Sequence, residues 1–117
     1  MRKPLPRQYH VKFADDVKAL PTRNLQRRAL QIITDVSKGI LEGKLLEEHP
    51  AVGDLGDCRK IYFDEHDDIA PRYRLVYRLL PNEVQAVCVE GITVGQRKAL
   101  AVYVEAARRL NRFVEDK

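Results

Sequence analysis

Long apolar runs and export signals are missing from this chain of 117 residues. The longest uninterrupted apolar stretch, from Ala99 to Val104, is far shorter than the roughly 20 residues that cross a bilayer. The N-terminus, Met1 to Arg7, is basic but is followed by no apolar segment. We therefore expect a cytoplasmic protein with no membrane partner.

Cysteine and histidine do not occur in the patterns that bind metals or form disulfides. Cys58 and Cys88 are isolated, with no CxxC spacing, and we expect both to be reduced and buried. The three histidines, His10, His49 and His66, have no ligand spacing to one another or to a cysteine. The sequence therefore predicts no metal site and no small-molecule cofactor.

Several enzyme signatures are also absent. The chain has no GxSxG nucleophile elbow, no GxxxxGK[ST] phosphate loop and no GxGxxG dinucleotide motif. These absences disfavour acyl hydrolases, nucleotide hydrolases and dinucleotide-dependent enzymes. Four carboxylates crowd residues 64–68, which is more typical of a solvated or partner-facing loop than of a catalytic cluster.

The composition that is present is that of one folded unit with unevenly distributed charge. Hydrophobic residues make up 44% and charged residues 32%, without repeats or linkers, so we expect a single domain over residues 1–117. Its core should span residues 8–112, with flexible ends at 1–7 and 113–117. The net charge is +4, with basic ends and an acidic middle, which favours a polyanionic partner such as RNA.

Periodicity predicts the first elements. Tyr9 to Phe13 alternates between apolar and polar residues, as in a half-buried strand, and Ala14 to Leu20 predicts a short helix that ends before Pro21. From Arg23 to Ile40 apolar residues recur at steps of three and four, which predicts the longest helix, and Gly39 and Gly43 mark its end. A connecting loop is expected over Leu45 to Asp57.

Three strands and a helix follow in the prediction. The strands are Cys58 to Phe63, Tyr73 to Leu80 and Val84 to Val89, and the helix runs from Gln96 to about Arg112. The order of strand, two helices, three-strand meander and helix predicts an α+β protein with a small antiparallel sheet and helices packed on it.

Strand alternation predicts that several cationic side chains and a tyrosine lie near the start of the last helix. The candidates are Lys60, Tyr62, Arg74 and Arg78 on the strands, and Arg97 and Lys98 at the beginning of the last helix. If the strand faces coincide, the group forms a basin for a phosphodiester, because free N–H groups at a helix start also favour an anion. The same charges could instead be unrelated surface residues paired with acids.

Four segments resemble a known family. They are Gly56-Asp57-Cys58-Arg59-Lys60-Ile61, Tyr73-Arg74-Leu75-Val76-Tyr77, Val94-Gly95-Gln96-Arg97 and Val102-Tyr103-Val104-Glu105-Ala106. In kind, order and spacing they resemble the RelE branch of the RelE/ParE superfamily of bacterial type II toxins, over about residues 8–112. The resemblance implies a RelE-like fold and a ribosome-dependent mRNA endoribonuclease that works without metal. It also implies a cognate antitoxin as partner, beside the ribosome and mRNA.

The resemblance assigns catalysis to Lys60, Arg74, Arg97 and Tyr103, whereas RNA contact by Tyr62, Arg78 and Lys98 is expected from their place in the cationic basin. Lys60 matches a lysine of proton transfer and phosphate contact, and Arg74 an arginine that stabilises the transition state or activates the nucleophile. Arg97 matches an arginine at the scissile phosphate. Tyr103 matches an aromatic that stacks on a base or assists proton transfer, although its spacing alone also suits a core residue.

Two features depart from the family pattern. Tyr62 stands where the RelE branch tends to have a second lysine, which leaves the general acid unassigned. The segment Asp64 to Arg72 is longer and more acidic than the family turn, and it could repel RNA or supply a base through His66 or Glu65. A ParE-like inhibitor of DNA gyrase that cleaves nothing, and an inactive family remnant, are the alternatives to a nuclease.

Overall fold

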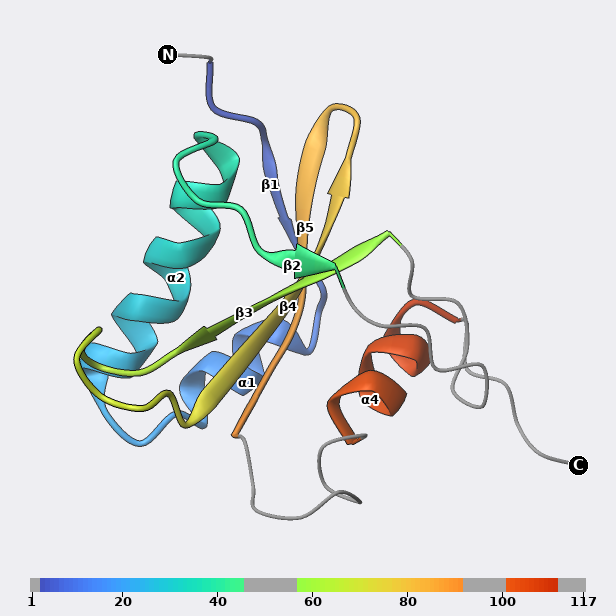
Figure 1. Cartoon of the computed structure of the whole chain (residues 1–117). Helices are drawn as coiled ribbons and strands as arrows, with labels where there is room; N and C mark the ends of the chain where they lie inside the picture. Colours follow the sequence, from blue (N-terminus) through green and yellow to red (C-terminus); the bar gives the residue numbers. More distant parts are fainter. Residues whose placement is uncertain (1–2, 46–56, 92–100, 112–117) are drawn as a thin grey trace, which may run out of the picture.

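The computed structural model describes residues 3–45, 57–91 and 101–111. The elements follow in the order β1 (Arg7–Tyr9), α1 (Phe13–Lys18), α2 (Arg23–Ser37), β2 (Lys44–Leu45), β3 (Cys58–Phe63), β4 (Tyr73–Leu80), β5 (Glu83–Gly91) and α4 (Ala101–Arg109) (Figure 1). The predicted α+β class is confirmed, and so is the predicted order of strand, two helices, meander and helix.

The five strands form one mixed sheet in the order β1-β5-β4-β3-β2. β3, β4 and β5 form the predicted antiparallel meander. β1 instead pairs with β5 in parallel, with Arg7 opposite Val84, because the chain crosses through α1 and α2 before it enters the meander. β2 adds a short strand beside β3 that sequence analysis did not predict, and it includes Leu45, which was expected to begin the connecting loop.

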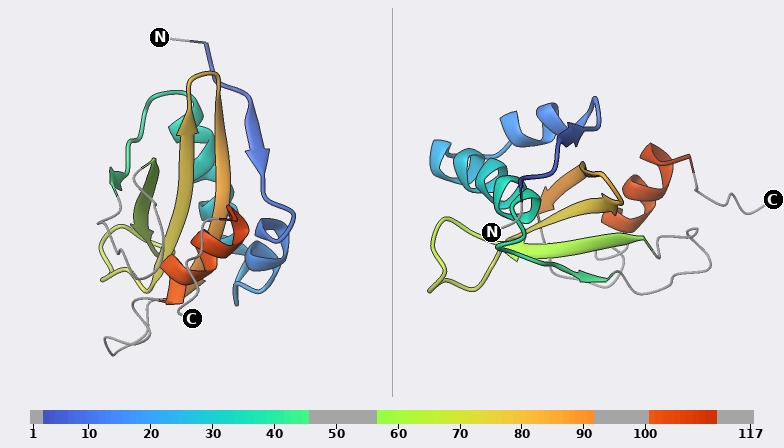
Figure 2. Two further views of the ribbon diagram at one scale, coloured as in Figure 1. Left: turned by 90° about the vertical axis from the view of Figure 1, so that its right-hand side faces the viewer. Right: turned by 90° about the horizontal axis from the view of Figure 1, so that it is seen from above.

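The sheet separates two apolar cores. α1 and α2 cover one face and α4 lies on the other, as the two views of Figure 2 agree. The larger core lies under α1 and α2, with Phe13, Leu25, Ile33, Leu75 and Tyr77 among its buried side chains. The smaller core under α4 consists of Cys58, Val76, Val87, Cys88, Ala106 and Ala107. Both cysteines are free and buried, as expected.

α2 forms where the apolar period predicts it. The Thr22 side chain caps the first turn by accepting a hydrogen bond from the Leu25 N–H at 3.2 Å. The helix ends at Ser37, just before Gly39, one of the two glycines predicted to mark its end, which takes a left-handed conformation with φ of 76° and turns the chain. Ile40, expected on the buried face, is therefore exposed.

The predicted strand over Tyr9 to Phe13 is wrong except at Tyr9, its first residue. β1 ends at Tyr9, and a turn follows in which the Phe13 N–H donates to the His10 carbonyl at 2.8 Å. Phe13 then begins α1 and is buried, whereas Val11 lies in the turn and is 84% exposed. Phe13 would be buried either in a strand with a two-residue period or after a turn into a helix. Local alternation therefore could not distinguish these two structures.

The last predicted helix is present as α4, and its predicted start at residues 96–100 lies outside the described residues. Ala106 and Ala107 are buried against the sheet, as the predicted apolar side requires. Over residues 3–45, 57–91 and 101–111, no helix is both long enough and apolar enough to cross a membrane.

Candidate functional site

The pairing of β3 with β4 brings a lysine, a tyrosine and an arginine to one face of the sheet. Tyr62 is the direct register partner of Arg74, and Lys60 pairs with Val76 one step along the same face. Residues that pair across an antiparallel ladder project to the same side. The juxtaposition predicted from alternation is therefore confirmed, and we call Lys60, Tyr62 and Arg74 the strand cluster.

The strand cluster lies on the α4 face. Cys58 and Val76 belong to the same alternating set of positions and pack in one cluster with Ala106 and Ala107 of α4. Phe63, from the other set, packs into the core beneath α1 and α2. The three polar side chains thus share their face with the smaller core.

The members of the strand cluster differ in their access to solvent. Arg74 is 4% exposed and Tyr62 is 41% exposed, with Lys60 between these extremes. Lys60 Nζ lies 5.5 Å from the centroid of the Tyr62 ring, within the range of a cation–π contact. The arrangement combines a buried guanidinium with a phenol that a ligand can reach.

The neighbouring cations change the acidity of the phenol. Burial by itself raises the pKa of Tyr62, but hydrogen bonds and positive charge from Lys60 and Arg74 outweigh it and lower this pKa below its ordinary value of 10.0. The same groups that stabilise a phenolate would stabilise negative charge on a phosphate brought beside them. The strand cluster therefore concentrates groups that favour negative charge beside them.

β2 adds a lysine to this face that sequence analysis did not identify. Lys44 is the register partner of Lys60, and its side chain is exposed. Gly43 allows the approach, because a Cβ there would lie 2.6 Å from the Lys60 carbonyl oxygen. The Gly43 N–H also donates to Tyr77 Oη at 2.8 Å. A strand as short as β2 has no alternation to detect, so Gly43 is the only local signal.

Arg78 lies further along the same face, opposite Cys58. Its Nη1 is 3.8 Å from Asp57 Oδ2, so part of its charge is balanced within the chain. Its predicted contact with RNA stays a prediction. Among the residues that the structure describes, no three His, Cys, Asp or Glu side chains are grouped so that they could hold a metal ion.

Comparison with known proteins finds relatives of the fold. No protein-family model and no curated protein matches the chain. A mutant of the E. coli toxin RelE in the free state superposes with a TM-score of 0.59 at 20% identity, covering 92% of this chain and 99% of that one. The chain has a RelE-like fold. The resemblance predicted from four short segments is thereby confirmed as a likeness of fold.

Two further solved structures agree with the RelE-like fold. The toxin–antitoxin complex RelBE2 from Mycobacterium tuberculosis matches with a TM-score of 0.53 at 22% identity, over 77% of this chain and 100% of that one. A crystal form of the isolated E. coli RelE toxin matches with a TM-score of 0.53 at 18% identity, over 91% and 98% of the two chains. Identities this low show a shared fold and leave the activity to be argued from the site.

Three site residues of the RelE-like prediction belong to the C-terminal part of the chain. Arg97 and Lys98 lie outside the described residues. Tyr103 lies in α4, whose backbone is described, but its side chain is outside the described part. α4 rests on the same face as the strand cluster, and the roles of all three residues stay predictions.

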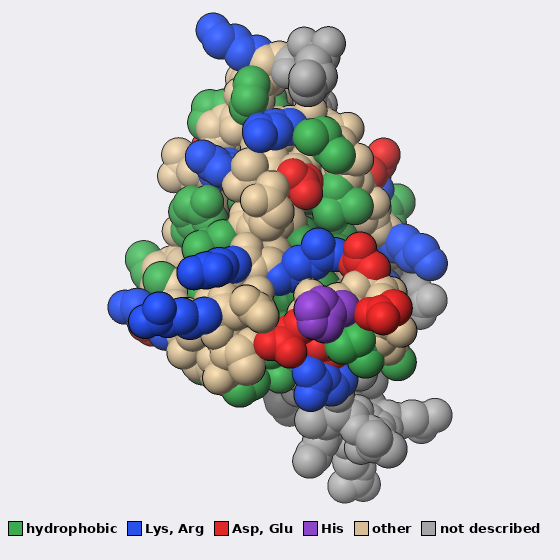
Figure 3. Space-filling model, turned by 90° about the vertical axis from the view of Figure 1, so that its left-hand side faces the viewer, with side chains coloured by type: hydrophobic (Ala, Val, Ile, Leu, Met, Phe, Trp, Pro, Cys, Tyr) green, Lys and Arg blue, Asp and Glu red, His purple; other side chains and the backbone are tan. Residues whose placement is uncertain are grey.

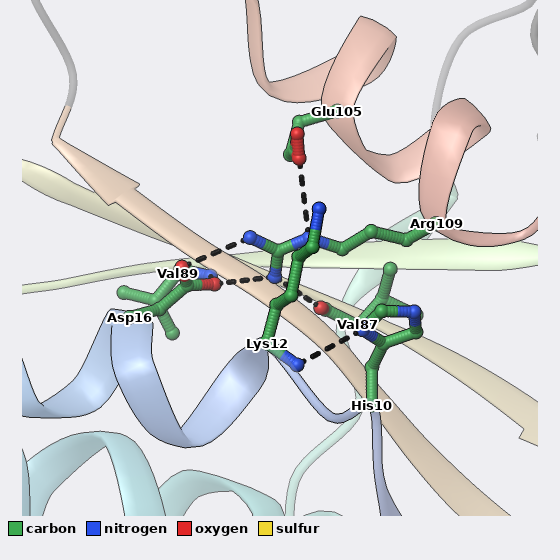
Figure 4. Close-up of polar contacts among 7 residues, drawn as sticks. All are labelled: His10, Lys12, Asp16, Val87, Val89, Glu105 and Arg109. Carbon is green, nitrogen blue, oxygen red and sulfur yellow. Dashed lines mark hydrogen bonds and ion pairs between the residues drawn. The ribbon is translucent and has the colours of Figure 1, made fainter.

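A buried ion pair holds α4 of this RelE-like fold against α1 and β5 (Figure 4). Arg109 donates to both carboxylate oxygens of Asp16, at 2.6 and 3.0 Å, and to the Val87 carbonyl at 2.8 Å. Asp16 in turn accepts the Val89 N–H at 3.0 Å, and Glu105 accepts from Arg109 Nε at 3.2 Å. The pairing of β1 with β5 ends at Ala86. Beyond that point the ion pair bonds to the backbone of β5 in place of a neighbouring strand.

We call Arg109 and Asp16 the α4 clamp. Their side chains are only 7% and 16% exposed. Burial lowers the pKa of Arg109, but the hydrogen bond and charge of Asp16 more than offset this and raise it, so the guanidinium stays charged. The two residues are far apart in the sequence and follow no shared motif, so sequence analysis could not pair them.

The acidic segment between β3 and β4 turns toward α2, away from the strand cluster. The Arg72 side chain and N–H bond to Asp64 and hold the pKa of that carboxyl well below its usual range. The Thr22 hydroxyl donates to Glu65 at 2.5 Å, and Arg28 bonds to Asp67. The bonds between Arg72 and Asp64 join the two ends of the segment, and those of Glu65 and Asp67 attach its middle to the N-terminal part of α2.

Basic, acidic and histidine side chains consequently lie side by side on the α2 side of the molecule (Figure 3). His66 and Glu65 line one shallow hollow there with Arg27 and Arg28. The idea that His66 or Glu65 replaces a missing base at the strand cluster is therefore wrong, because both residues are held beside the helix that covers the opposite face.

Proposed function

We propose that this chain is the toxin of a toxin–antitoxin pair and acts as a ribosome-dependent mRNA endoribonuclease. The strand cluster carries the proposal, since it places a buried arginine, a lysine and a reachable tyrosine on one face of a RelE-like sheet. The solved structures that share the fold are RelE toxins and a toxin–antitoxin complex, which supports the first half of the proposal.

The chemistry proposed is cleavage by the RNA itself. The 2′-OH attacks the adjacent phosphorus, the bond to the 5′-oxygen breaks, and the products are a 2′,3′-cyclic phosphate and a 5′-OH. The protein needs to provide in-line geometry, relief of charge on the phosphorane and a path for protons. These demands can be met by cations and a phenol, without a His/Glu pair.

Arg74 is suited to stabilise the charge of the phosphorane. Its planar guanidinium matches two phosphate oxygens and stays protonated at all working pH values. Because Arg74 is almost fully buried, its charge acts through a medium less polar than water, which strengthens its attraction to the phosphate. Lys60 and Lys44 extend positive charge along the same face. The ribosome would splay the mRNA into this position.

Expression of the chain in bacteria tests this function. We expect growth arrest, with primer extension on a translated message revealing cuts at fixed codon positions. Arg74→Ala should lower cleavage by about 10²–10³-fold, as the loss of one transition-state donor does elsewhere. Arg23→Ala is the matched control, because Arg23 is exposed on α2 and outside the strand cluster. Unchanged cleavage by Arg74→Ala would contradict the proposal.

Growth arrest without cuts would point to the gyrase alternative. A supercoiling assay with purified chain then decides the matter, because a ParE-like inhibitor blocks gyrase while leaving mRNA intact. Expression without toxicity would instead indicate an inactive remnant. The nuclease proposal requires toxicity, cuts and uninhibited gyrase together.

The proposed function includes a cognate antitoxin as partner. The RelBE2 structure from Mycobacterium tuberculosis is a toxin–antitoxin complex, which supports a partner for this fold. If a short reading frame lies beside this gene, expression of the two together should yield a co-purifying complex that neither arrests growth nor cuts mRNA. Purification of the chain alone from that system would contradict this part of the proposal.

A further inference from the structure

Tyr62 is placed for a second role beside contact with RNA. We propose that Tyr62 is the catalytic base of the cleavage, with its phenolate oxygen accepting the proton of the attacking 2′-OH. This inference rests on the proposed ribonuclease function and assigns its proton acceptor. In the strand cluster Tyr62 is the register partner of Arg74, the group proposed to hold the phosphate.

The position of Tyr62 gives it reach toward a bound phosphodiester. Its side chain is 41% exposed, whereas Arg74, directly opposite, is 4% exposed. Directly paired side chains in an antiparallel sheet begin about 4.5–5.5 Å apart at their Cβ atoms. A phosphate held by Arg74 would therefore bring its own ribose close to the phenol oxygen.

Charged groups face Tyr62 from the neighbouring strands. Lys60 of β3 and Arg74 of β4 both hydrogen-bond to the phenol and favour its anion, and they hold its pKa below the ordinary value. Lys44 of β2 stands opposite Lys60, and Glu90 of β5 stands opposite Arg74 in the register. Cations thus occupy three of these four neighbouring positions.

Other charged groups of this face are held elsewhere. Arg78 lies toward the far end of β4 and pairs with Asp57. On α4, Glu105 and Arg109 are directed toward Asp16 in the α4 clamp. Among the side chains that the structure describes, the strand cluster therefore contributes most to the field at Tyr62.

The remaining members of the strand cluster are poor bases. Arg74 does not release its proton in proteins, and Lys60 is an ammonium that first has to lose a proton. A phenol whose anion is stabilised by two cations can accept a proton once ionised, and it can do so while Arg74 stays charged. The structure thus divides the work between Arg74 as charge stabiliser and Tyr62 as base.

In this proposal Lys60 supplies the proton that the leaving 5′-oxygen needs. The 2′-O–H bond breaks and its proton goes to the Tyr62 phenolate, while the 2′-oxygen bonds to phosphorus. The P–O5′ bond breaks, and the leaving 5′-oxygen takes a proton from the Lys60 ammonium. Transfer of one proton from the Tyr62 phenol to the Lys60 amine then restores both groups, so no oxidant, reductant or metal ion takes part.

Single-turnover cleavage of ribosome-bound mRNA tests the role of Tyr62. For the wild type we expect the rate to rise with the phenolate fraction, to level off at a pH below 10.0, and to fall again at higher pH where the Lys60 ammonium, the proton donor to the 5′-oxygen, loses its proton. Tyr62→Phe keeps the ring and removes only the hydroxyl, and it should lower the rate by about 10²–10⁴-fold at saturating ribosomes and remove this rise.

Tyr9→Phe is the matched control. Tyr9 is 44% exposed, close to the value for Tyr62, but it lies on β1 and packs against Phe13 of α1. This variant should cleave at the wild-type rate with the wild-type pH profile. Site-specific fluorotyrosine at position 62, a more acidic phenol, should move the levelling of the rate to lower pH, which a structural role for Tyr62 would not do.

The outcomes separate this inference from the proposed function. If the wild type cleaves and Tyr62→Phe cleaves equally fast at saturation, the role of Tyr62 as base is overturned and the nuclease stands. A rate that falls only below saturation makes Tyr62 a binding residue and also overturns the inference. If the wild type cleaves no ribosome-bound message at any pH, the proposed function falls and this inference with it.

Discussion

The two faces of the sheet bury different kinds of side chain. Under α1 and α2 lie large side chains, including Phe13, Leu25 and Ile33, with Leu75 and Tyr77 from the sheet. Under α4 the buried residues are Cys, Val and Ala, and the same face carries the strand cluster. Among the described residues, the face under α1 and α2 therefore buries the larger apolar side chains, and the α4 face combines smaller apolar residues with the charged strand cluster.

The difference extends to how the helices are attached. α2 is held by a continuous apolar stripe and an N-cap, whereas α4 combines a small apolar contact with the α4 clamp. A charged clamp is specific in direction, because Arg109 meets Asp16 and the Val87 carbonyl at once. We infer that the clamp sets where α4 sits over the strand cluster.

Breaking the α4 clamp is expected to have the largest effect on stability. Asp16→Ala leaves Arg109 buried without its carboxylate and should lower the free energy of unfolding by about 3–5 kcal/mol. Asp16→Asn should cost less, because its amide oxygen can still accept the Val89 N–H. Urea unfolding measures both changes. A loss below about 0.5 kcal/mol in Asp16→Ala would mean that apolar contact alone attaches α4.

A matched pair of core truncations compares the two faces directly. Ile33→Ala, in the large core, should lower the free energy of unfolding by about 2–5 kcal/mol through lost burial and a cavity. Val87→Ala removes a smaller buried side chain under α4 and should cost about 1.5–3 kcal/mol. Denaturant unfolding of both variants gives the ratio. Equal losses would show that the α4 face contributes as much apolar stability as the α2 face.

Removing a charge from the α4 face should leave stability almost unchanged. Lys44 is exposed on β2, so Lys44→Ala should change the free energy of unfolding by no more than about 0.5 kcal/mol. If Lys44 contacts RNA, the variant should weaken RNA binding and reduce the salt slope of the affinity by about 1. A binding titration at several salt concentrations measures this. An unchanged slope would place Lys44 outside the RNA contact, and Lys38→Ala, on the turn after α2, serves as control.

The strand cluster could be predicted because strand alternation is a local property. Tyr62 and Arg74 each lie at known parity in strands whose pattern is clear, and only their pairing had to be supposed. The long helix could be predicted for the same reason, since its buried residues recur at the helical period. Gly39 marks its end, as predicted, and Ile40 is exposed because the chain turns at Gly39 before the apolar pattern ends.

Other parts of the site depend on contacts that no local pattern records. Lys44 joins the cationic face through a strand too short to alternate, and Asp16 meets Arg109 from the opposite end of the chain. For the acidic loop between β3 and β4, the sequence shows the charge but not the direction in which the loop turns. Its composition is plain in the sequence, but only the bonds of Glu65 and Asp67 to α2 reveal that it faces away from the strand cluster.

The sequence by itself determined the α+β class, the helix α2, the meander and the side of each strand on which Lys60, Tyr62 and Arg74 lie. These features follow from the spacing of apolar residues along a few turns or a few strand positions. Only the tertiary structure decided which cations meet, where the acidic loop turns and how α4 is held. Those outcomes depend on pairing between distant segments, whose geometry exists only after the sheet has formed.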